Sequence, residues 1–192
     1  MENNTQLKEM IRSMVIDVLQ GQKQEMASSQ PIKQAPRGQV EPGVFDTVDE
    51  AIQAAKAAQA RFEDCTLATR EKVIADIRAA MRPRVQELAQ KTVEETGMGR
   101  VADKVLKLNL TLDKTPGVED LVTECETGDN GMTLYELSAY GVIGAVTPST
   151  NPAETLICNT IGMLAAGNAV FFSVHPGAKH LSRLLVSELN QI

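Results

Sequence analysis

Apolar residues at the spacing of one helix face open the chain. Between residues 5 and 19 they recur three and four positions apart, while charged residues occupy the other faces. These apolar positions are Leu7, Met10, Ile11, Met14, Val15 and Val18. Residues 20–43 then have the Gln-, Ser-, Pro- and Gly-rich composition of a flexible linker. The pattern predicts an amphipathic helix within residues 1–19 on a tether, which favours an interaction tail; docking of the helix on its own domain is the alternative.

Helical periodicity dominates from Val44, where folded structure is expected to begin, to about residue 117. Thr47-Val48-Asp49-Glu50 is a capping box that predicts a helix to about Phe62. A second helix is expected from Thr69, a break at Pro83 and a third helix that ends at Gly97. The positions expected to face inward are Val48, Ile52, Ala55 and Phe62 in the first helix, Val73, Ile77 and Met81 in the second, and Val101, Val105, Leu108 and Leu112 in a fourth that Thr115-Pro116-Gly117 stops.

The period changes after this point. Residues 127–131, Thr-Gly-Asp-Asn-Gly, carry turn chemistry between extended stretches, which predicts a β-hairpin near 122–138 whose second strand runs from Met132 to Ser138. Two strands alone are marginally stable. The hairpin is therefore expected either to reach a neighbouring subunit as an oligomerisation arm or to pack on its own chain.

A strand–helix–strand–helix pattern closes the sequence. The apolar runs 141–146 and 169–172 suit strands buried on both faces, and residues 153–166 between them suit a crossover helix. Another helix is expected after Pro176-Gly177 and to continue to the last residue. The predicted class is α/β, with helices first, then a β-hairpin and a right-handed βαβ unit of Rossmann type that begins an incomplete nucleotide-binding domain over 44–192.

Composition excludes several function classes. Among 192 residues, 19 are basic and 25 acidic, so the net charge of −6 argues against binding a nucleic-acid backbone. Aromatic residues make up 3%, too few for a base-stacking platform. No apolar stretch is long enough to span a membrane. Three widely spaced cysteines form neither a disulfide framework nor a zinc motif, and His175 and His180 lack partners at ligand spacing, so no metal site is expected.

Two loops are the candidates for chemistry, because ligands of parallel α/β sheets bind beyond the carboxyl ends of the strands. These loops, 147–152 and 173–177, should lie side by side if their strands are neighbours. Helix N-termini follow both, so free backbone N–H groups are expected at that edge. No GxGxxG fingerprint is present, so a bound dinucleotide would not use that pyrophosphate turn. Ordinary strand-to-helix turns are the alternative.

Several uncommon motifs in the same order resemble the aldehyde dehydrogenase superfamily. They are TPSTNP at 147–152, LAAGNAVFFSVHPGAK at 164–179, ETGMGRVADK at 95–104, TPGVEDL at 115–121 and TGDNGM at 127–132. More narrowly, they resemble the CoA-acylating aldehyde dehydrogenases of propanediol and ethanolamine utilisation. The match runs from about residue 44 to the end. The helix within 1–19 resembles the tail that directs such enzymes into bacterial microcompartments, where residues 5–19 would meet shell or cargo proteins.

The resemblance implies a reaction that converts a short-chain aldehyde, NAD and CoA to acyl-CoA and NADH in the microcompartment lumen of the cytoplasm. A cysteine thiolate would attack the aldehyde, and the amide of Asn151 would stabilise the oxyanion. The nicotinamide-ribose side of the cofactor would meet Thr147, Pro148, Ser149 and Thr150, and the adenosine side Ser173, His175, Pro176 and Gly177. Many family members have Lys where this chain has Ser173, which favours NAD over NADP.

The resemblance also implies that the nucleophilic cysteine lies beyond residue 192. Cys65, Cys125 and Cys158 match no catalytic motif, and Cys158 is expected to be a buried, inert thiol in the crossover helix. The 192 residues alone are therefore expected to be inactive, and the full-length enzyme to be a homo-oligomer. A non-catalytic microcompartment-targeting module and a bare nucleotide-binding fold are the alternatives.

Overall fold

The computed structural model describes residues 41–192. The predicted helix within 1–19 and most of the linker at 20–43 lie outside the described residues. No helix between residues 41 and 192 is long and apolar enough to cross a membrane.

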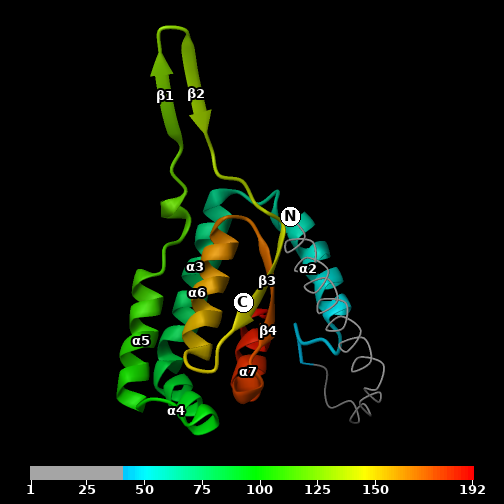
Figure 1. Ribbon diagram of the computed structural model, residues 1–192, viewed down its shortest axis with the longest axis vertical. Helices are drawn as coiled ribbons and strands as arrows, with labels where there is room; N and C mark the ends of the chain where they lie inside the picture. The colour runs from blue at the N-terminus through cyan, green and yellow to red at the C-terminus, as the bar shows by residue number, and fades with distance from the viewer. Residues whose placement is uncertain (1–40) are drawn as a thin grey trace, which may run out of the picture. The chain divides into compact units, whose positions relative to one another are not determined.

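Six helices and four strands make up this part of the chain (Figure 1). The helices are α2 (Val48–Phe62), α3 (Leu67–Met81), α4 (Val85–Thr96), α5 (Val101–Lys114), α6 (Pro152–Ala165) and α7 (Lys179–Leu189). The strands are β1 (Glu124–Gly128), β2 (Gly131–Tyr135), β3 (Val142–Thr147) and β4 (Ala169–Val174). The last helix ends at Leu189 and not, as predicted, at the last residue.

Local signals account for most helix ends. The capping box of α2 is formed, since the hydroxyl of Thr47 accepts from Glu50 N and the Glu50 carboxylate accepts from Thr47 N. The second helix begins two residues earlier than predicted, because the side chain of Thr66 caps it by accepting from Thr69 N. The break at Pro83 is confirmed as a 3₁₀ turn, Arg82–Arg84, and Gly97 ends α4 in a left-handed conformation.

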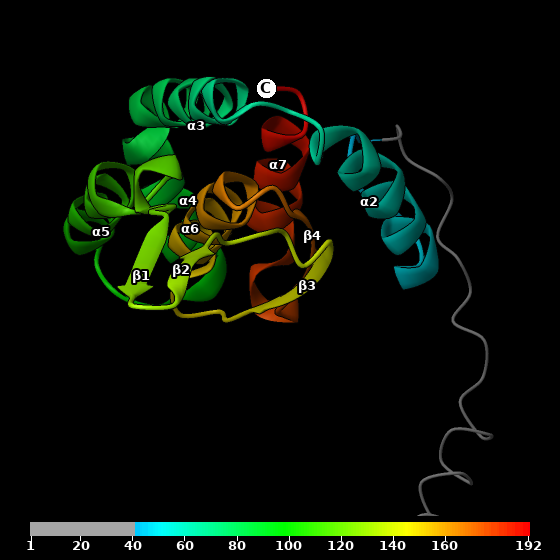
Figure 2. The same ribbon diagram turned by 90° about the horizontal axis from the view of Figure 1, so that it is seen from above.

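Helix α6 lies at the centre of the core. Helices α3, α5 and α7 pack around it, and β3 and β4 lie along its remaining side (Figure 2). Leu156, Ile157 and Ile161 on α6 are fully buried. The predicted inward positions Ile77, Met81, Leu108 and Leu112 are buried in the same cluster.

The predicted βαβ unit is confirmed. Strands β3 and β4 are parallel neighbours, and α6 connects them. Their register pairs Val142 with Ala169 at one end and Thr147 with Val174 at the other. The carboxyl ends of both strands, and the loops that follow, therefore lie at one edge of the sheet.

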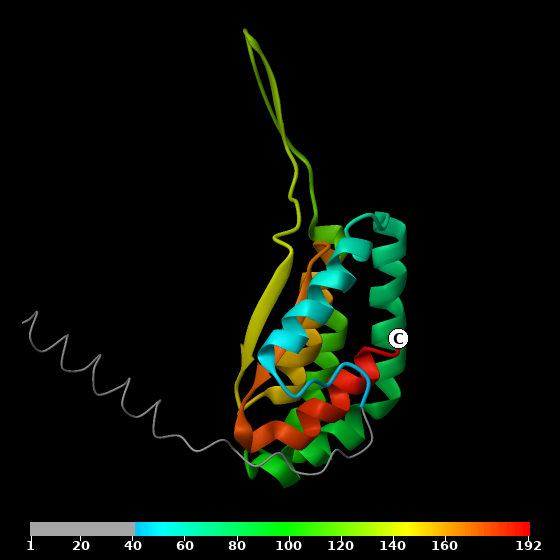
Figure 3. The same ribbon diagram turned by 90° about the vertical axis from the view of Figure 1, so that its right-hand side faces the viewer.

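The hairpin projects away from the helices (Figures 1 and 3). Strands β1 and β2 are antiparallel, and Asp129-Asn130 form the two-residue turn between them. The second strand ends at Tyr135, three residues short of the prediction. Every residue of both strands is exposed, so packing of the hairpin on its own chain is wrong for residues 41–192.

Three burial predictions are wrong. The outer face of β3 is open, with Val146 83% exposed, because α6 covers one face of this strand only. Val48 is exposed, and α2 has no fully buried residue, because this helix touches the sheet but is separated from α7 by a groove. Cys158 is exposed, since it lies on the face of α6 opposite the core.

Candidate functional site

The two predicted loops lie side by side at the carboxyl edge of the β3–β4 sheet. Val146 pairs with Ser173 and Thr147 with Val174, so the chain leaves both strands at the same level. A Cβ atom added to Gly177 would lie 3.9 Å from the Cβ of Ser149, which is van der Waals distance between the loops. The edge therefore presents one continuous surface made from both loops.

Asn151 ends the first loop as the N-cap residue of α6, and two lysines hold its amide oxygen. Nζ of Lys104 and Nζ of Lys107 each lie 3.1 Å from Oδ1 of Asn151 and donate to it. An ammonium group can only donate, so the oxygen of the amide must face the two lysines. The amide NH₂ consequently points to the other side, with both of its donors away from helix α5.

Lys104 is buried, although a lysine is rarely buried unless it is paired. Its ammonium also donates to the backbone oxygen of Thr150 and lies 3.5 Å from Oε1 of Glu154. Glu154 is buried in the first turn of α6, and neither carboxylate oxygen has a hydrogen-bond partner in the described part of the chain. A buried ion pair thus joins α5 to the start of α6.

Backbone N–H groups of the second loop and of the start of α7 already have side-chain partners. Nδ1 of His175 accepts a hydrogen bond from Gly177 N at 3.0 Å, so the imidazole caps its own turn. The carboxylate of Glu95 accepts from His180 N at 2.8 Å and from Leu181 N at 2.7 Å. The expectation of free N–H groups at both helix N-termini is therefore wrong for α7, because a carboxylate from α4 already occupies the first turn.

The predicted cofactor-binding residues differ in accessibility. Thr147 is buried, and its hydroxyl has no hydrogen-bond partner within residues 41–192. Ser149 is half-buried, with its hydroxyl 3.9 Å from the sulfur of Met98. The other predicted residues lie exposed on the two loops: Pro148, Thr150, Ser173, His175, Pro176 and Gly177. Their roles in binding remain predictions.

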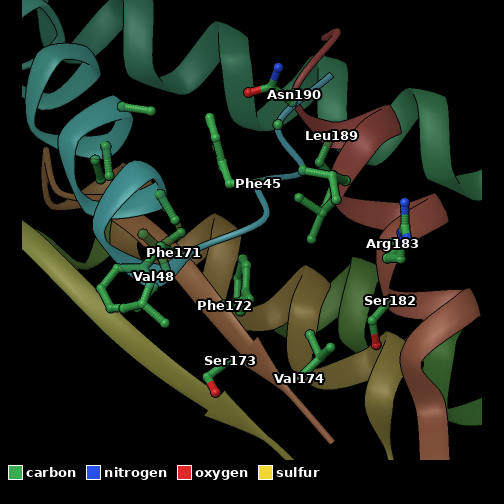
Figure 4. A pocket seen from close by; sticks show the side chains of 18 of the residues that line it. Phe45, Val48, Phe171, Phe172, Ser173, Val174, Ser182, Arg183, Leu189 and Asn190 are labelled. Atoms are coloured by element: carbon green, nitrogen blue, oxygen red, sulfur yellow. The ribbon is translucent and has the colours of Figure 1, made fainter. Parts of the chain in front are cut away.

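A groove of about 610 Å³ runs along β4 between α2 and α7 (Figure 4). Phe171 lies beside Val48 of α2, whereas Phe172 and Val174 lie on the side of α7 (Figure 4). Consecutive residues of β4, from Ala169 to Val174, line this groove and bring it to the second loop. Sequence analysis did not predict this groove, because residues 169–172 were expected to form a strand buried on both faces.

No cluster suited to a metal ion occurs in the part of the chain that the structure describes. Sequence analysis also missed three charged residues that organise the site: Glu95, Lys104 and Glu154. The available signal was Lys104 itself, because it lies on the apolar stripe of α5 three residues after Val101 and four before Leu108.

Comparisons with known proteins point to one family. The sequence profile described as the aldehyde dehydrogenase family matches residues 18–191. A CoA-propanoylating propanal dehydrogenase of Salmonella typhimurium is 46% identical over 190 residues, which cover 99% of this chain and 39% of that protein.

Solved structures agree. A propionaldehyde dehydrogenase from the fucose utilisation bacterial microcompartment of Clostridium phytofermentans matches with a TM-score of 0.74 and 50% identity, over 78% of this chain and 34% of that one. The propionaldehyde dehydrogenase of Rhodopseudomonas palustris, with bound CoA and an acylated cysteine, matches with a TM-score of 0.76 and 49% identity, over 79% and 35%. The chain therefore spans less than two fifths of the length of these proteins.

Proposed function

Because this chain belongs to the aldehyde dehydrogenase family, we propose that it forms the N-terminal part of a CoA-acylating enzyme. The enzyme converts a short-chain aldehyde, NAD and CoA to an acyl-CoA and NADH. Three similar proteins described above support this assignment. They are the propanal dehydrogenase, the propionaldehyde dehydrogenase from a bacterial microcompartment and the propionaldehyde dehydrogenase with bound CoA. Their α/β fold is also the fold of this chain, as its TM-scores and the confirmed βαβ unit indicate.

The observation that carries the proposal is the orientation of Asn151. When a thiolate adds to an aldehyde carbonyl, the oxygen gains negative charge and needs donors already in place. The two lysines hold Oδ1 of Asn151, so its NH₂ group is left to donate to the negatively charged oxygen of the aldehyde. The amide does not titrate, so it donates at any pH at which the protein is folded. The nucleophilic cysteine belongs, in this proposal, to a segment beyond residue 192.

The exposed loop residues fit a dinucleotide. Thr150 and Ser173 offer exposed hydroxyl groups at the sheet edge. NAD bound at this edge would supply the hydride acceptor for oxidation of the aldehyde carbon. Thr147, Pro148, Ser149 and Thr150 would hold its nicotinamide-ribose side, and Ser173, His175, Pro176 and Gly177 would hold its adenosine side. The carboxylate of Glu95 at the start of α7 disfavours a phosphate there, because it already uses the N–H groups and repels anions.

Two further parts of the molecule suit an assembled enzyme. The hairpin exposes Met132, Leu134 and Tyr135, apolar side chains that contact with a second subunit would bury. Residues 5–19 are proposed to bind microcompartment shell or cargo proteins, which would place the enzyme in the microcompartment lumen of the cytoplasm. The microcompartment source of one similar structure supports this location.

The activity is tested on the complete reading frame that contains this chain. CoA-dependent formation of NADH is measured with acetaldehyde and propanal. We expect Asn151→Ala to lower turnover about 10²–10³-fold, the usual effect of losing one oxyanion donor. The matched control is Asn159→Ala, which removes a half-buried amide from the same helix. Absence of CoA-dependent NADH formation would overturn the enzyme assignment, and near-normal turnover of Asn151→Ala would remove this residue from the mechanism.

The targeting role is tested separately. Deletion of residues 1–19 is expected to abolish association with shell proteins while the enzyme stays soluble and active. Shell association that survives the deletion would contradict the proposed tail.

A further inference from the structure

We infer that Lys104 and Lys107 of helix α5 are positioning residues that orient the amide of Asn151 for catalysis. The inference rests on the proposed function, because it assigns these lysines a role only through the oxyanion donor. Neither lysine is proposed to touch the substrate.

The geometry leaves Asn151 little freedom. Its backbone oxygen accepts from Thr155 N at 3.0 Å, which fixes the main chain at the start of α6. Its side-chain oxygen accepts from two ammonium groups at 3.1 Å each. Without them, an amide can rotate and exchange its oxygen and nitrogen positions at modest cost. With them, the exchanged orientation would place the NH₂ group against two ammonium groups, so this orientation is strongly disfavoured.

The two lysines contribute differently. Lys104 is buried, donates to Thr150 O and Asn151 Oδ1, and is ion-paired with the carboxylate of Glu154. It therefore anchors the loop as well as the amide. Lys107 is exposed one turn further along α5, and its ammonium donates to Oδ1 of Asn151. Lys107 thus isolates the orienting effect from the anchoring of the loop.

Charge is also arranged in favour of the donor role. Two ammonium groups on the oxygen side polarise the amide and strengthen its N–H donors on the other side. The Glu154 carboxylate compensates the buried charge of Lys104, so the site gains orientation without an unpaired buried ion. Anchoring of the loop alone would require only Lys104 and would not explain why a second ammonium group contacts the same oxygen.

The test uses the complete enzyme and the variants Lys107→Ala, Lys107→Arg and Lys114→Ala. Lys107→Ala is expected to lower kcat about tenfold, within the range for a misplaced reacting group, with unchanged KM values for aldehyde, NAD and CoA and an unchanged Tm. Lys107→Arg, which keeps a cationic donor, is expected to restore most of kcat. Lys114→Ala removes an exposed lysine from the same helix and is expected to match the parent enzyme.

Each variant is also made in the Asn151→Ala background. If the lysine acts through Asn151, Lys107→Ala causes no further loss there, and the two effects are strongly non-additive. Additive losses, or a raised KM for NAD or CoA with unchanged kcat, would overturn the inference, since Lys107 would then act independently or bind a phosphate.

Lys104 is tested through the double variant Lys104→Met/Glu154→Leu. Removing both buried charges together leaves no unpaired charge in the core, so the variant is expected to fold and its kcat can be measured. We expect this double variant to lower kcat in the parent enzyme and to cause no further loss of kcat in the Asn151→Ala background. A full kcat in this double variant and in Lys107→Ala, while Asn151→Ala is impaired, would overturn the positioning role and leave the proposed function intact. A full kcat in Asn151→Ala would instead overturn the role of Asn151 and the positioning role that depends on it.

Discussion

Glu95 offers a direct test of how the second loop is held in place. Its carboxylate accepts from the N–H groups of His180 and Leu181 across more than eighty residues of sequence. Ala178, the residue at the N-cap of α7, has no side chain able to do this. Glu95 therefore performs from α4 the function that a serine or aspartate normally performs within the helix.

The size of its effect follows from these two bonds. A hydrogen bond to a charged group contributes about 1.5–3 kcal/mol, and loss of a helix cap costs about 0.5–2 kcal/mol. Because the carboxylate is half-buried and water can replace part of each bond, we expect Glu95→Ala to lower the free energy of unfolding by about 2 kcal/mol. Glu95→Gln keeps one accepting oxygen and should lose about half as much.

The assay is urea unfolding of the 192-residue chain followed by far-UV circular dichroism, with the m-value unchanged. Glu94→Ala is the matched control: the neighbouring carboxylate is exposed, accepts from the Gln90 side chain on its own helix, and should change stability by less than about 0.5 kcal/mol. Equal effects of Glu95→Ala and Glu94→Ala would refute the capping role.

Three other predictions concern stability and ionisation. Asn168→Ala removes the buried acceptor of two backbone N–H groups just before β3. We expect the free energy of unfolding in urea to fall by about 2–4 kcal/mol, and a fall of less than about 1 kcal/mol would contradict this. Gly167→Ala places a Cβ at a φ of 80° and 2.7 Å from a guanidinium, so it should cost more than about 1 kcal/mol, whereas Gly162→Ala inside α6 should be neutral or stabilising in the same assay. The hydrogen bond from Arg100 lowers the pKa of Asp103 below 3.8, so the stabilisation from this pair is present above pH 3.8 and is lost as the pH falls through the lowered value; an NMR titration should show the pKa returning towards 3.8 in Arg100→Ala, and no change would contradict the assignment.

The helix boundaries and the βαβ unit were predictable because their signals are local. The capping box at Thr47, the break at Pro83 and the left-handed turn at Gly97 each depend on residues within one helical turn. The same locality placed Asn151 and Ser173 at one sheet edge, because parallel neighbours connected by a single helix must end together.

The contacts that shape the site were not predictable by the same means. Lys104 meets Asn151 across 47 residues, and Glu95 meets Leu181 across 86. Neither periodicity nor turn chemistry carries information over such separations. The capping of α7 by Glu95 shows the consequence most clearly, because a distant carboxylate occupies the helix N-terminus that the sequence indicated to be open to an anion.

The burial predictions that are wrong concern apolar residues at the surface, and not residues of the core around α6. The sequence of β3 has the apolar pattern of a strand covered on both faces, yet Val146 is 83% exposed and only Ala145 and Thr147 of this strand are buried. Leu137 and Tyr140, between the hairpin and β3, are also exposed, at 74% and 95%. Apolar side chains gathered on one side of a parallel sheet require a cover, because such sheets are stable when both faces are buried. The mismatch between pattern and exposure therefore lies at the outer face of β3 and the base of the hairpin, whereas the residues around α6 are buried as their pattern predicts.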